Sequence, residues 1–385
     1  MSEPTASRRE SSLELFLEHM LKIDASDLYL TQGSPAIFRV DGVGHPAKVP
    51  ITAEHLDVMA TSLMTAEQIE EFQRTHEMNL AIAVGEGRFR VNIFRQRSAT
   101  GMVVRLVRTK IKALADLDLP SILADIALSR RGLVLMVGGT GSGKSTTLAA
   151  MIDHRNSTET GHIITVEDPV EFIHPHKKCI VTQREVGADT LSFAAALKNT
   201  LRQAPDVILI GEIRDSETME AAITFAETGH LCMSTLHSNN ASQATERILN
   251  FFPPARQHEV LLQLSLNIRA IVSQRLVKSS SGGRAAALEI LLDTPRIREL
   301  LKRGDIDGLK EAMDQSTHEG CRTFDTSLFE LYTLERITEE DALRAADSAN
   351  NLRIRIDRYK ATGGTVLPDN EPPLRLLRQE PQGKR

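Results

Sequence analysis

A glycine-rich segment at residues 138–145 has the spacing with the clearest chemical meaning in the chain. It fits the pattern G-x-x-x-x-G-K-[ST], which marks the phosphate-binding loop of nucleoside triphosphatases. Glycines let the backbone wrap closely around an anion, and amide N–H groups at the next helix bind phosphate oxygens. We expect Lys144 to reach the β- and γ-phosphates of ATP, and Ser145 to bind Mg²⁺. The expected nucleotide-binding residues are Gly138, Gly139, Thr140, Gly141, Ser142, Gly143, Lys144, Ser145 and Thr146.

Two acidic positions downstream could supply the carboxylates that phosphoryl transfer requires. The apolar run at residues 207–211 ends in Glu212, which is the pattern of a Walker B strand whose acid supports Mg²⁺ or the attacking water. A second strand pattern, at residues 163–166, leads into an acidic turn that contains Glu171. Ligands of doubly wound sheets bind at the carboxyl ends of strands, so both acids could face the nucleotide. The acidic turn, taken alone, also fits a solvated surface loop.

Histidines stand at both ends of a further apolar run, at His230 and His237. Two histidines seven residues apart do not have the spacing of a metal site. A polar side chain at a strand end can sense the γ-phosphate, so Thr235 and His237 are candidate sensors. His174 and His176 are expected to lie at the surface.

Short strands that alternate with longer helices from residue 132 onward must position these side chains. This alternation predicts an α/β fold with a mostly parallel sheet. The apolar stripe at residues 256–273 predicts one long helix, and the chain beyond residue 295 is expected to be mainly helical. The predicted strands are residues 133–137, 162–166, 206–211, 230–235 and 285–291.

The part of the chain before residue 108 shows a different mixture of patterns, which predicts a small α+β domain. An amphipathic helix is expected to begin near residue 11, and further helices are expected at residues 53–63 and 65–74. The expected strands are residues 27–31, 36–40, 88–94 and 101–107.

The composition is that of a globular protein with a formal net charge of −5. This charge argues against a large non-specific nucleic-acid surface. No apolar run is long enough to span a bilayer, and the first ten residues lack the apolar segment of a signal peptide. Three widely spaced cysteines, Cys179, Cys232 and Cys321, fit a reducing cytoplasm and no zinc module.

The order of four motifs resembles that of the type II/type IV secretion ATPase superfamily. Residues 138–151, 164–172, 208–215 and 226–237 are similar to its Walker A motif, Asp box, Walker B motif and His box. The resemblance implies a hexameric ring whose subunits have a PAS-like N-terminal domain and a RecA-like ATPase domain with a helical C-terminal part.

The same resemblance assigns roles to single residues. Glu171 would activate water, Glu212 would be the Walker B acid, and His237 would belong to the His box. Arginines of the small domain would reach the nucleotide, and Arg90 and Arg105 match this role better than Arg97. Spacing alone also allows these arginines simply to cover a sheet face.

Within the superfamily the chain is most similar to the pilus retraction ATPases of the PilT/PilU type. Retraction ATPases like PilT carry the motif Ala-Ile-Arg-Asn-Leu-Ile-Arg-Glu, from which residues 296–303 depart. This departure and the longer tail favour the PilU type. The resemblance therefore implies a cytoplasmic accessory motor for type IV pilus retraction and twitching motility, bound peripherally to the inner membrane at the pilus base. Its implied partners are a PilT-type ATPase and the inner-membrane pilus platform protein, without a specific nucleic acid.

Three alternatives stay open: the motor of a related secretion or DNA-uptake machine, a regulatory nucleotide-binding subunit, and a nucleic-acid translocase, which the acidic charge disfavours. The expected divisions are a disordered N-terminus at 1–10, the PAS-like domain at 11–108, a linker at 109–120, the ATPase core at 121–292, a helical subdomain at 293–361 and a flexible tail at 362–385.

Overall fold

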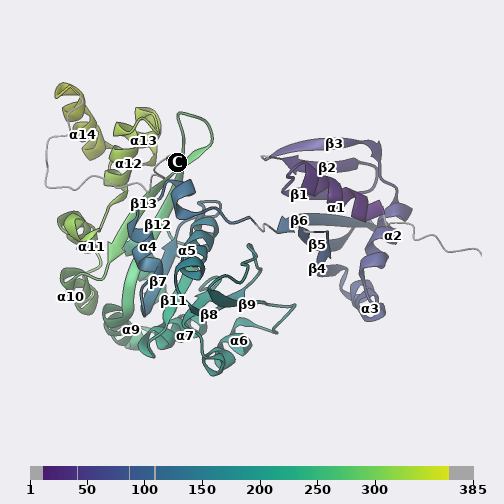
Figure 1. Ribbon diagram of the computed structural model, residues 1–385, viewed down its shortest axis with the longest axis horizontal. Helices are drawn as coiled ribbons and strands as arrows, with labels where there is room; N and C mark the ends of the chain where they lie inside the picture. Colours follow the sequence, from purple (N-terminus) through teal and green to yellow (C-terminus); the bar gives the residue numbers. More distant parts are fainter. Residues whose placement is uncertain (1–11, 41, 86, 108–109, 364–385) are drawn as a thin grey trace, which may run out of the picture. The chain divides into compact units, whose positions relative to one another are not determined.

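The computed structural model describes residues 12–40, 42–85, 87–107 and 110–363, which form two compact units (Figure 1). The first unit contains residues up to 110 together with residues 171–173. The second unit contains residues 111–170 and the chain from residue 174 onward. The expected disorder of residues 1–10 falls outside the described part of the chain, as do residues 364–385 of the flexible tail expected at 362–385.

An antiparallel six-stranded sheet with the order β3-β2-β1-β6-β5-β4 forms the framework of the first unit. The expected helices and strands of this part are confirmed, and β3 and β4 are two strands that the sequence analysis did not anticipate. The elements are α1 (Ser12–Lys22), β1 (Asp27–Leu30), β2 (Pro35–Val40), β3 (Val43–Pro50), α2 (Ala53–Leu63), α3 (Ala66–Thr75), β4 (Glu77–Val84), β5 (Gly87–Gln96) and β6 (Ala99–Val107).

The two unanticipated strands lie at the edges of this sheet. β3 contains Pro46 and Pro50, which obscured it because proline lacks the N–H group of a regular ladder. An edge strand tolerates proline, since one side of the strand has no neighbour.

One face of the six-stranded sheet is apolar because buried and exposed residues alternate along its strands. Phe89, Val91 and Ile93 of β5 are fully buried or nearly so. Leu13 and Leu17 lie one turn apart on α1 and join the same core cluster. The opposite face therefore carries the polar side chains of β5, including its arginine at position 90.

A seven-stranded sheet with the order β13-β12-β7-β11-β10-β8-β9 forms the second unit. All neighbouring strands are parallel except β12 and β13, so the predicted mostly parallel sheet is confirmed. The five predicted strands are present, and β9 and β12 complete the sheet. The strands are β7 (Gly132–Val137), β8 (Gly161–Glu167), β9 (Cys179–Glu185), β10 (Val207–Ile210), β11 (Leu231–Leu236), β12 (Ile268–Lys278) and β13 (Arg284–Leu292).

The prediction of one long helix over residues 256–273 is wrong in its last third. Helix α9 ends at Asn267, and β12 begins at Ile268. The apolar spacing continues across this boundary, but Ile268, Ile271 and Val272 are β-branched and fit a strand better than a helix. These residues are buried where β12 pairs with β7, and this pairing, which helical periodicity does not reveal, stabilises the strand.

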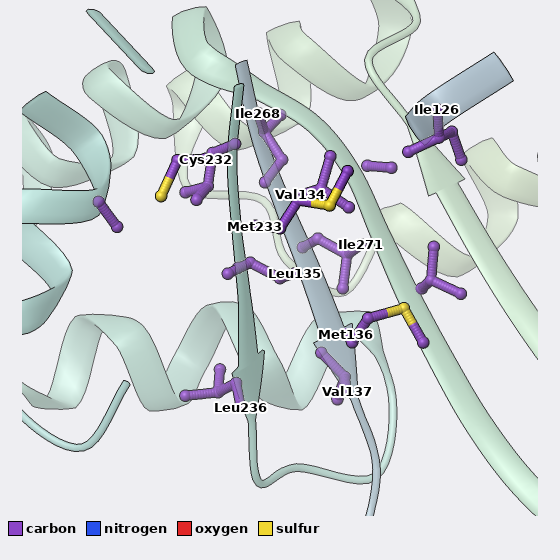
Figure 2. Close-up of a cluster of buried hydrophobic side chains, with 14 of the residues drawn as sticks. Ile126, Val134, Leu135, Met136, Val137, Cys232, Met233, Leu236, Ile268 and Ile271 are labelled. Atoms are coloured by element: carbon purple, nitrogen blue, oxygen red, sulfur yellow. The ribbon is translucent and has the colours of Figure 1, made fainter. Parts of the chain in front are cut away.

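The centre of the second unit is a continuous apolar cluster around β7 and β11. Figure 2 shows Val134 of β7 near Met233 of β11, and Ile271 of β12 on the other side of β7. Every residue of β7 and β11 is buried, as expected for central parallel strands. This rigid core fixes the ends of the strands, where the predicted chemistry lies.

Helix α4 (Ile122–Ala127) leads into β7. It ends at Ala127, and Arg155 donates hydrogen bonds from its guanidinium to the carbonyl oxygens of Ala127 and Ser129. No helix among the described residues has the length and apolar character to cross a membrane. The helices of the second unit are η1 (Leu114–Leu117), α4 (Ile122–Ala127), α5 (Lys144–Thr158), α6 (Phe193–Thr200), η2 (Leu201–Gln203), α7 (Ser216–Glu227), α8 (Ala241–Asn250), α9 (Pro254–Asn267), α10 (Pro295–Arg303), α11 (Leu309–Gln315), η3 (Thr317–Glu319), α12 (Phe324–Thr333), α13 (Glu339–Ala345) and α14 (Ala349–Ala361).

Candidate nucleotide-binding site

Four neighbouring parallel strands bring the predicted nucleotide-binding segments to one edge of the seven-stranded sheet. β7, β11, β10 and β8 lie side by side in this order. Parallel strands end at the same edge, so the glycine-rich loop after β7 meets the segments after β10 and β11. The structure thereby brings Lys144, Glu212 and His237 together, although they are up to 93 positions apart in the sequence.

The glycine-rich loop has a backbone that only glycine adopts easily at its two ends. Gly138 has a φ of 155° and Gly143 a φ of 90°. A Cβ atom at Gly143 would lie 2.6 Å from the Nε2 atom of Gln274, and one at Gly138 would lie 2.7 Å from the Gln274 carbonyl oxygen. Helix α5 begins directly at Lys144, and no side chain caps its first turn. Its first N–H groups and the positive end of the helix are therefore available to an anion.

Lys144 lies within the loop and is only 7% exposed. Its Nζ atom donates hydrogen bonds to the carbonyl oxygens of Gly138 and Gly139, over 2.7 and 2.9 Å. The Oγ atom of Ser142 is buried and has no hydrogen-bond partner among the described residues. A buried hydroxyl group of this kind normally has a partner, so the loop fits a ligand with several acceptor oxygens, such as a polyphosphate.

Glu212 lies just past the end of β10 and is held by two basic side chains. Its Oε2 atom accepts a hydrogen bond of 2.9 Å from Nε of Arg214, and its Oε1 atom lies 3.5 Å from Nε2 of His237. Arg214 also lies 3.5 Å from a carboxylate oxygen of Asp168, which follows β8. Three strand ends are therefore linked through side chains. Such a link restricts the carboxylate of Glu212 to a narrow set of positions.

Two residues at the end of β11 were predicted to sense the γ-phosphate. The Oγ1 atom of Thr235 donates a 2.6 Å hydrogen bond to the carbonyl oxygen of Gly211, which fixes the turn that carries Glu212. Burial lowers the pKa of His237, the charge of Lys144 lowers it further, and Glu212 opposes both effects. The imidazole is therefore mostly neutral near pH 7, when it can either donate or accept a hydrogen bond.

Ser145 is the second residue of α5, and Thr146 is the third. No group of three or more histidine, cysteine, aspartate or glutamate side chains forms a metal site within the described residues. This is compatible with Mg²⁺ held by one hydroxyl group, one carboxylate and phosphate oxygens, since Mg²⁺ seldom has an all-protein cage.

Glu171 is exposed and lies four residues past the end of β8. It belongs to the short segment 171–173 that groups with the first unit. The flanking residues of the second unit are anchored to β9. The backbone N–H of Val170 donates to Glu185, and that of His174 donates to Gln183.

Arg90 and Arg105 are directly opposite each other on β5 and β6, and so they share one face of the first sheet. Arg105 is also opposite Asp27 of β1, and its Nε atom donates a 2.8 Å hydrogen bond to the Asp27 carboxylate. This hydrogen bond raises the pKa of Arg105. The Arg105 side chain is nevertheless 67% exposed, so its guanidinium can still donate hydrogen bonds to another anionic group.

Two further histidines considered in the sequence analysis, His230 and His174, lie outside the glycine-rich loop. His230 stands at the start of β11, at the opposite end from His237, and its Nδ1 atom lies 3.0 Å from Thr228 Oγ1. The expectation that His174 is a surface residue is wrong, because it is only 6% exposed. Burial lowers the pKa of His174 to about 4.

Because His174 is buried, we expect the folded protein to become less stable in mild acid. The unfolded chain binds a proton near pH 6.5, whereas the folded chain resists it until about pH 4, so the free energy of unfolding should fall as the pH falls through this window. Between pH 6.5 and 5.0 the loss should be about 1–2 kcal/mol. Urea unfolding at several pH values should show this slope in the wild type and a flatter one in His174→Asn. Replacement of the exposed His258 by Asn should leave the slope unchanged, and parallel curves for the wild type and His174→Asn would contradict the assignment.

One contact of the loop was not anticipated from the sequence. Gln274 of β12 contacts Ser142 of the glycine-rich loop, although it lies 132 positions downstream of that residue. Its only signal in the sequence is that Ser273 and Gln274 follow the apolar residues 270–272 and precede Arg275. That signal was hidden because the run was read as the end of a helix.

Comparison with known proteins gives consistent matches over most of the chain. A family model described as type II/IV secretion system protein matches residues 5–358. The chain is 53% identical to the type IV pilus ATPase PilU of Pseudomonas aeruginosa, over 89% of this chain and 91% of that protein. It is 41% identical to the retraction ATPase PilT of the same organism, over 86% and 96% of the two chains. A crystal structure of the pilus retraction motor PilT with bound ADP superimposes with a TM-score of 0.83 at 38% identity, covering 89% of this chain and 99% of that one.

Proposed function

The chain belongs to the type II/IV secretion system protein family, and on that basis we propose that it is an ATPase motor for type IV pilus retraction. The observation that carries the proposal is the loop at residues 138–145, because its buried lysine and the positive φ angles of Gly138 and Gly143 fit a phosphate site at the expected sheet edge. Because the chain is similar to PilU and PilT over most of its length, we infer that its ATP hydrolysis drives pilus retraction and twitching motility.

We infer a separate role in hydrolysis for each of the predicted site residues. The loop and Lys144 bind the phosphates, and Ser145 with Glu212 would hold Mg²⁺, which neutralises charge on the transferring phosphoryl group. Glu171 would accept the proton of the attacking water, and His237 would sense the γ-phosphate. Arg90 and Arg105 would add positive charge from the first unit.

We infer a PAS-like fold for residues 11–108, a linker at 109–120, a RecA-like core at 121–292 and a helical subdomain at 293–361. The six-stranded antiparallel sheet and the mostly parallel seven-stranded sheet support this division, as does the likeness to PilT. A hexameric ring of such subunits would turn changes at the nucleotide into movement. It would work at the cytoplasmic face of the inner membrane, against the pilus platform protein.

The chain fits an accessory motor that acts with a PilT-type ATPase. It is more similar to PilU than to PilT, at 53% against 41% identity. The stretch at residues 296–303, which departs from the PilT-type motif, forms helix α10, and α10 begins at Pro295 after the N-cap Thr294. A regulatory nucleotide-binding subunit is the second candidate, because the same departure allows a role in a mixed complex without turnover of its own.

Complementation of a strain that lacks this gene tests the proposed function. The wild type and the exposed-lysine control Lys178→Ala should restore twitching and normal pilus length, whereas Lys144→Ala should not. The wild type should lose this effect in a strain that also lacks the PilT-type ATPase. Full complementation by Lys144→Ala would reject the motor and favour the regulatory subunit.

A further inference from the structure

Gln274 reaches the back of the glycine-rich loop from a different part of the sheet. It lies on β12, next to β7, and is 3% exposed. Its Nε2 atom donates a 2.9 Å hydrogen bond to the carbonyl oxygen of Ser142, and its Oε1 atom accepts a 2.8 Å hydrogen bond from Oγ1 of Thr147. One amide group therefore joins the loop to the first turn of α5. Both bonds need a side chain that donates and accepts at once, which an uncharged amide does.

Gln274 lies close to the backbone at both ends of the loop, at Gly138 and at Gly143. Its side chain occupies the space that a Cβ atom at Gly143 would need, and its backbone carbonyl occupies that of a Cβ atom at Gly138. The loop backbone at Gly138 and Gly143 therefore lies close against Gln274, where only glycine leaves room for it. A shift of Gln274 would move the loop backbone directly.

Gln274 is itself held between two anchored neighbours on β12. The Oγ atom of Ser273 donates to Oε1 of Glu289, which also accepts a 2.7 Å hydrogen bond from the backbone N–H of Ala241. Arg275 lies 2.7 Å from the Asp347 carboxylate and donates a hydrogen bond to the carbonyl oxygen of Ala345. Its guanidinium also stacks on Phe324, 3.8 Å from the ring centroid. These contacts fix the strand on both sides of Gln274, so its amide is a preorganised support.

We infer that Gln274 is a positioning residue for nucleotide binding, because its amide holds the loop and the start of α5 in the arrangement that binds phosphate. The inference rests on the proposed ATPase function and adds a residue outside the four motifs. In this role Gln274 acts on nucleotide binding through its hydrogen bonds with Ser142 and Thr147. A substitution should therefore weaken nucleotide affinity more than it lowers the stability of the fold.

The test compares Gln274→Glu and Gln274→Met with the wild type, and with Gln315→Glu as the control. Gln315 lies on the exposed surface of α11. The dissociation constant of ATP is measured with Mg²⁺ by calorimetry between pH 5.5 and 8.5, together with the melting temperature of the nucleotide-free protein. Gln274→Met should weaken ATP binding about tenfold at every pH, since it removes both hydrogen bonds. The control should bind as the wild type does.

Gln274→Glu gives a readout that a merely structural role would not produce. At pH 8.5 its carboxylate cannot donate to the Ser142 carbonyl, so ATP binding should be about tenfold weaker than in the wild type. Burial raises the pKa of a carboxyl group, and the protonated acid can donate as the amide does. Relative to the wild type at each pH, affinity should recover at least threefold by pH 5.5, while Gln274→Met should not recover.

Three outcomes decide the inference. Weaker binding with a pH-dependent recovery in Gln274→Glu supports it, even if Gln274→Met fails to fold. Unchanged ATP affinity in both variants, with or without a lower melting temperature, overturns it and leaves Gln274 a structural residue. Absence of ATP binding in the wild type would reject the proposed function itself, and this inference with it.

Discussion

Lys144→Ala should reduce ATP hydrolysis by at least about 100-fold, the loss expected when a buried charged donor is removed from a preorganised site. The structure shows why no other group should replace it. Lys144 is 7% exposed and is held by the carbonyl oxygens of Gly138 and Gly139, inside the curve of the loop. An alanine leaves those two carbonyls facing any bound phosphate without a cation between them, so binding should weaken along with turnover.

A phosphate-release assay and an ATP binding isotherm on purified protein measure both effects. Lys178→Ala is the matched control, because Lys178 is an exposed lysine of the same unit whose Nζ atom donates a hydrogen bond to the carbonyl oxygen of Thr158. Hydrolysis by Lys144→Ala at the wild-type rate would show that the loop at residues 138–145 is not the catalytic site.

The sequence predicted this sheet edge because two local signals agree there. The glycine spacing needs a strand before it and a helix after it, and apolar runs ending in Glu212 and His237 have the length of buried parallel strands. The carboxyl ends of parallel strands share an edge, so the assembly of these segments follows from the element pattern alone. The element pattern does not predict the ion pairs of Arg214 with Asp168 and Glu212, because they depend on how the side chains are oriented.

Residues that act across the sheet were harder to predict. Gln274 comes from β12, whose first six residues continue the apolar stripe of α9 and carry no break such as glycine or proline. Helical and strand readings compete in such a run, and only the neighbouring β7 decides between them. His174 was misjudged for a related reason, since its sequence neighbours, Ile173 and Pro175, give no local sign that the fold leaves its side chain only 6% exposed.

The arginines of the first unit illustrate a third limit. Alternation along β5 and β6 predicts that Arg90 and Arg105 share a face, and their pairing in the antiparallel register agrees. The hydrogen bond from Arg105 to Asp27 depends on β1, which is 78 positions away, and on the order of strands in the sheet. Local patterns therefore predict which face of this sheet is charged, but they do not predict which side chains bond to its arginines.

Glu171→Gln should bind ATP with nearly wild-type affinity and hydrolyse it about 100-fold or more slowly, because an amide keeps the shape of the carboxyl group but cannot take a proton from water. The carboxyl group is exposed, while Val170 and His174 on either side are tied to Glu185 and Gln183 of β9. A side chain held at the tip of a short anchored segment can meet a substrate water without blocking phosphate binding. Single-turnover hydrolysis and the dissociation constant of ATP are the two measurements.

Glu159→Gln provides the control for loss of one negative charge, since Glu159 is exposed just after the end of α5. The two measurements separate three roles for Glu171. Slow turnover with intact affinity identifies the general base. If affinity falls together with turnover, the Glu171 charge instead supports the bound nucleotide or its Mg²⁺. Wild-type turnover would remove Glu171 from the chemistry, and Glu212, which Arg214 and His237 already hold in place, would then be the acid that orients water.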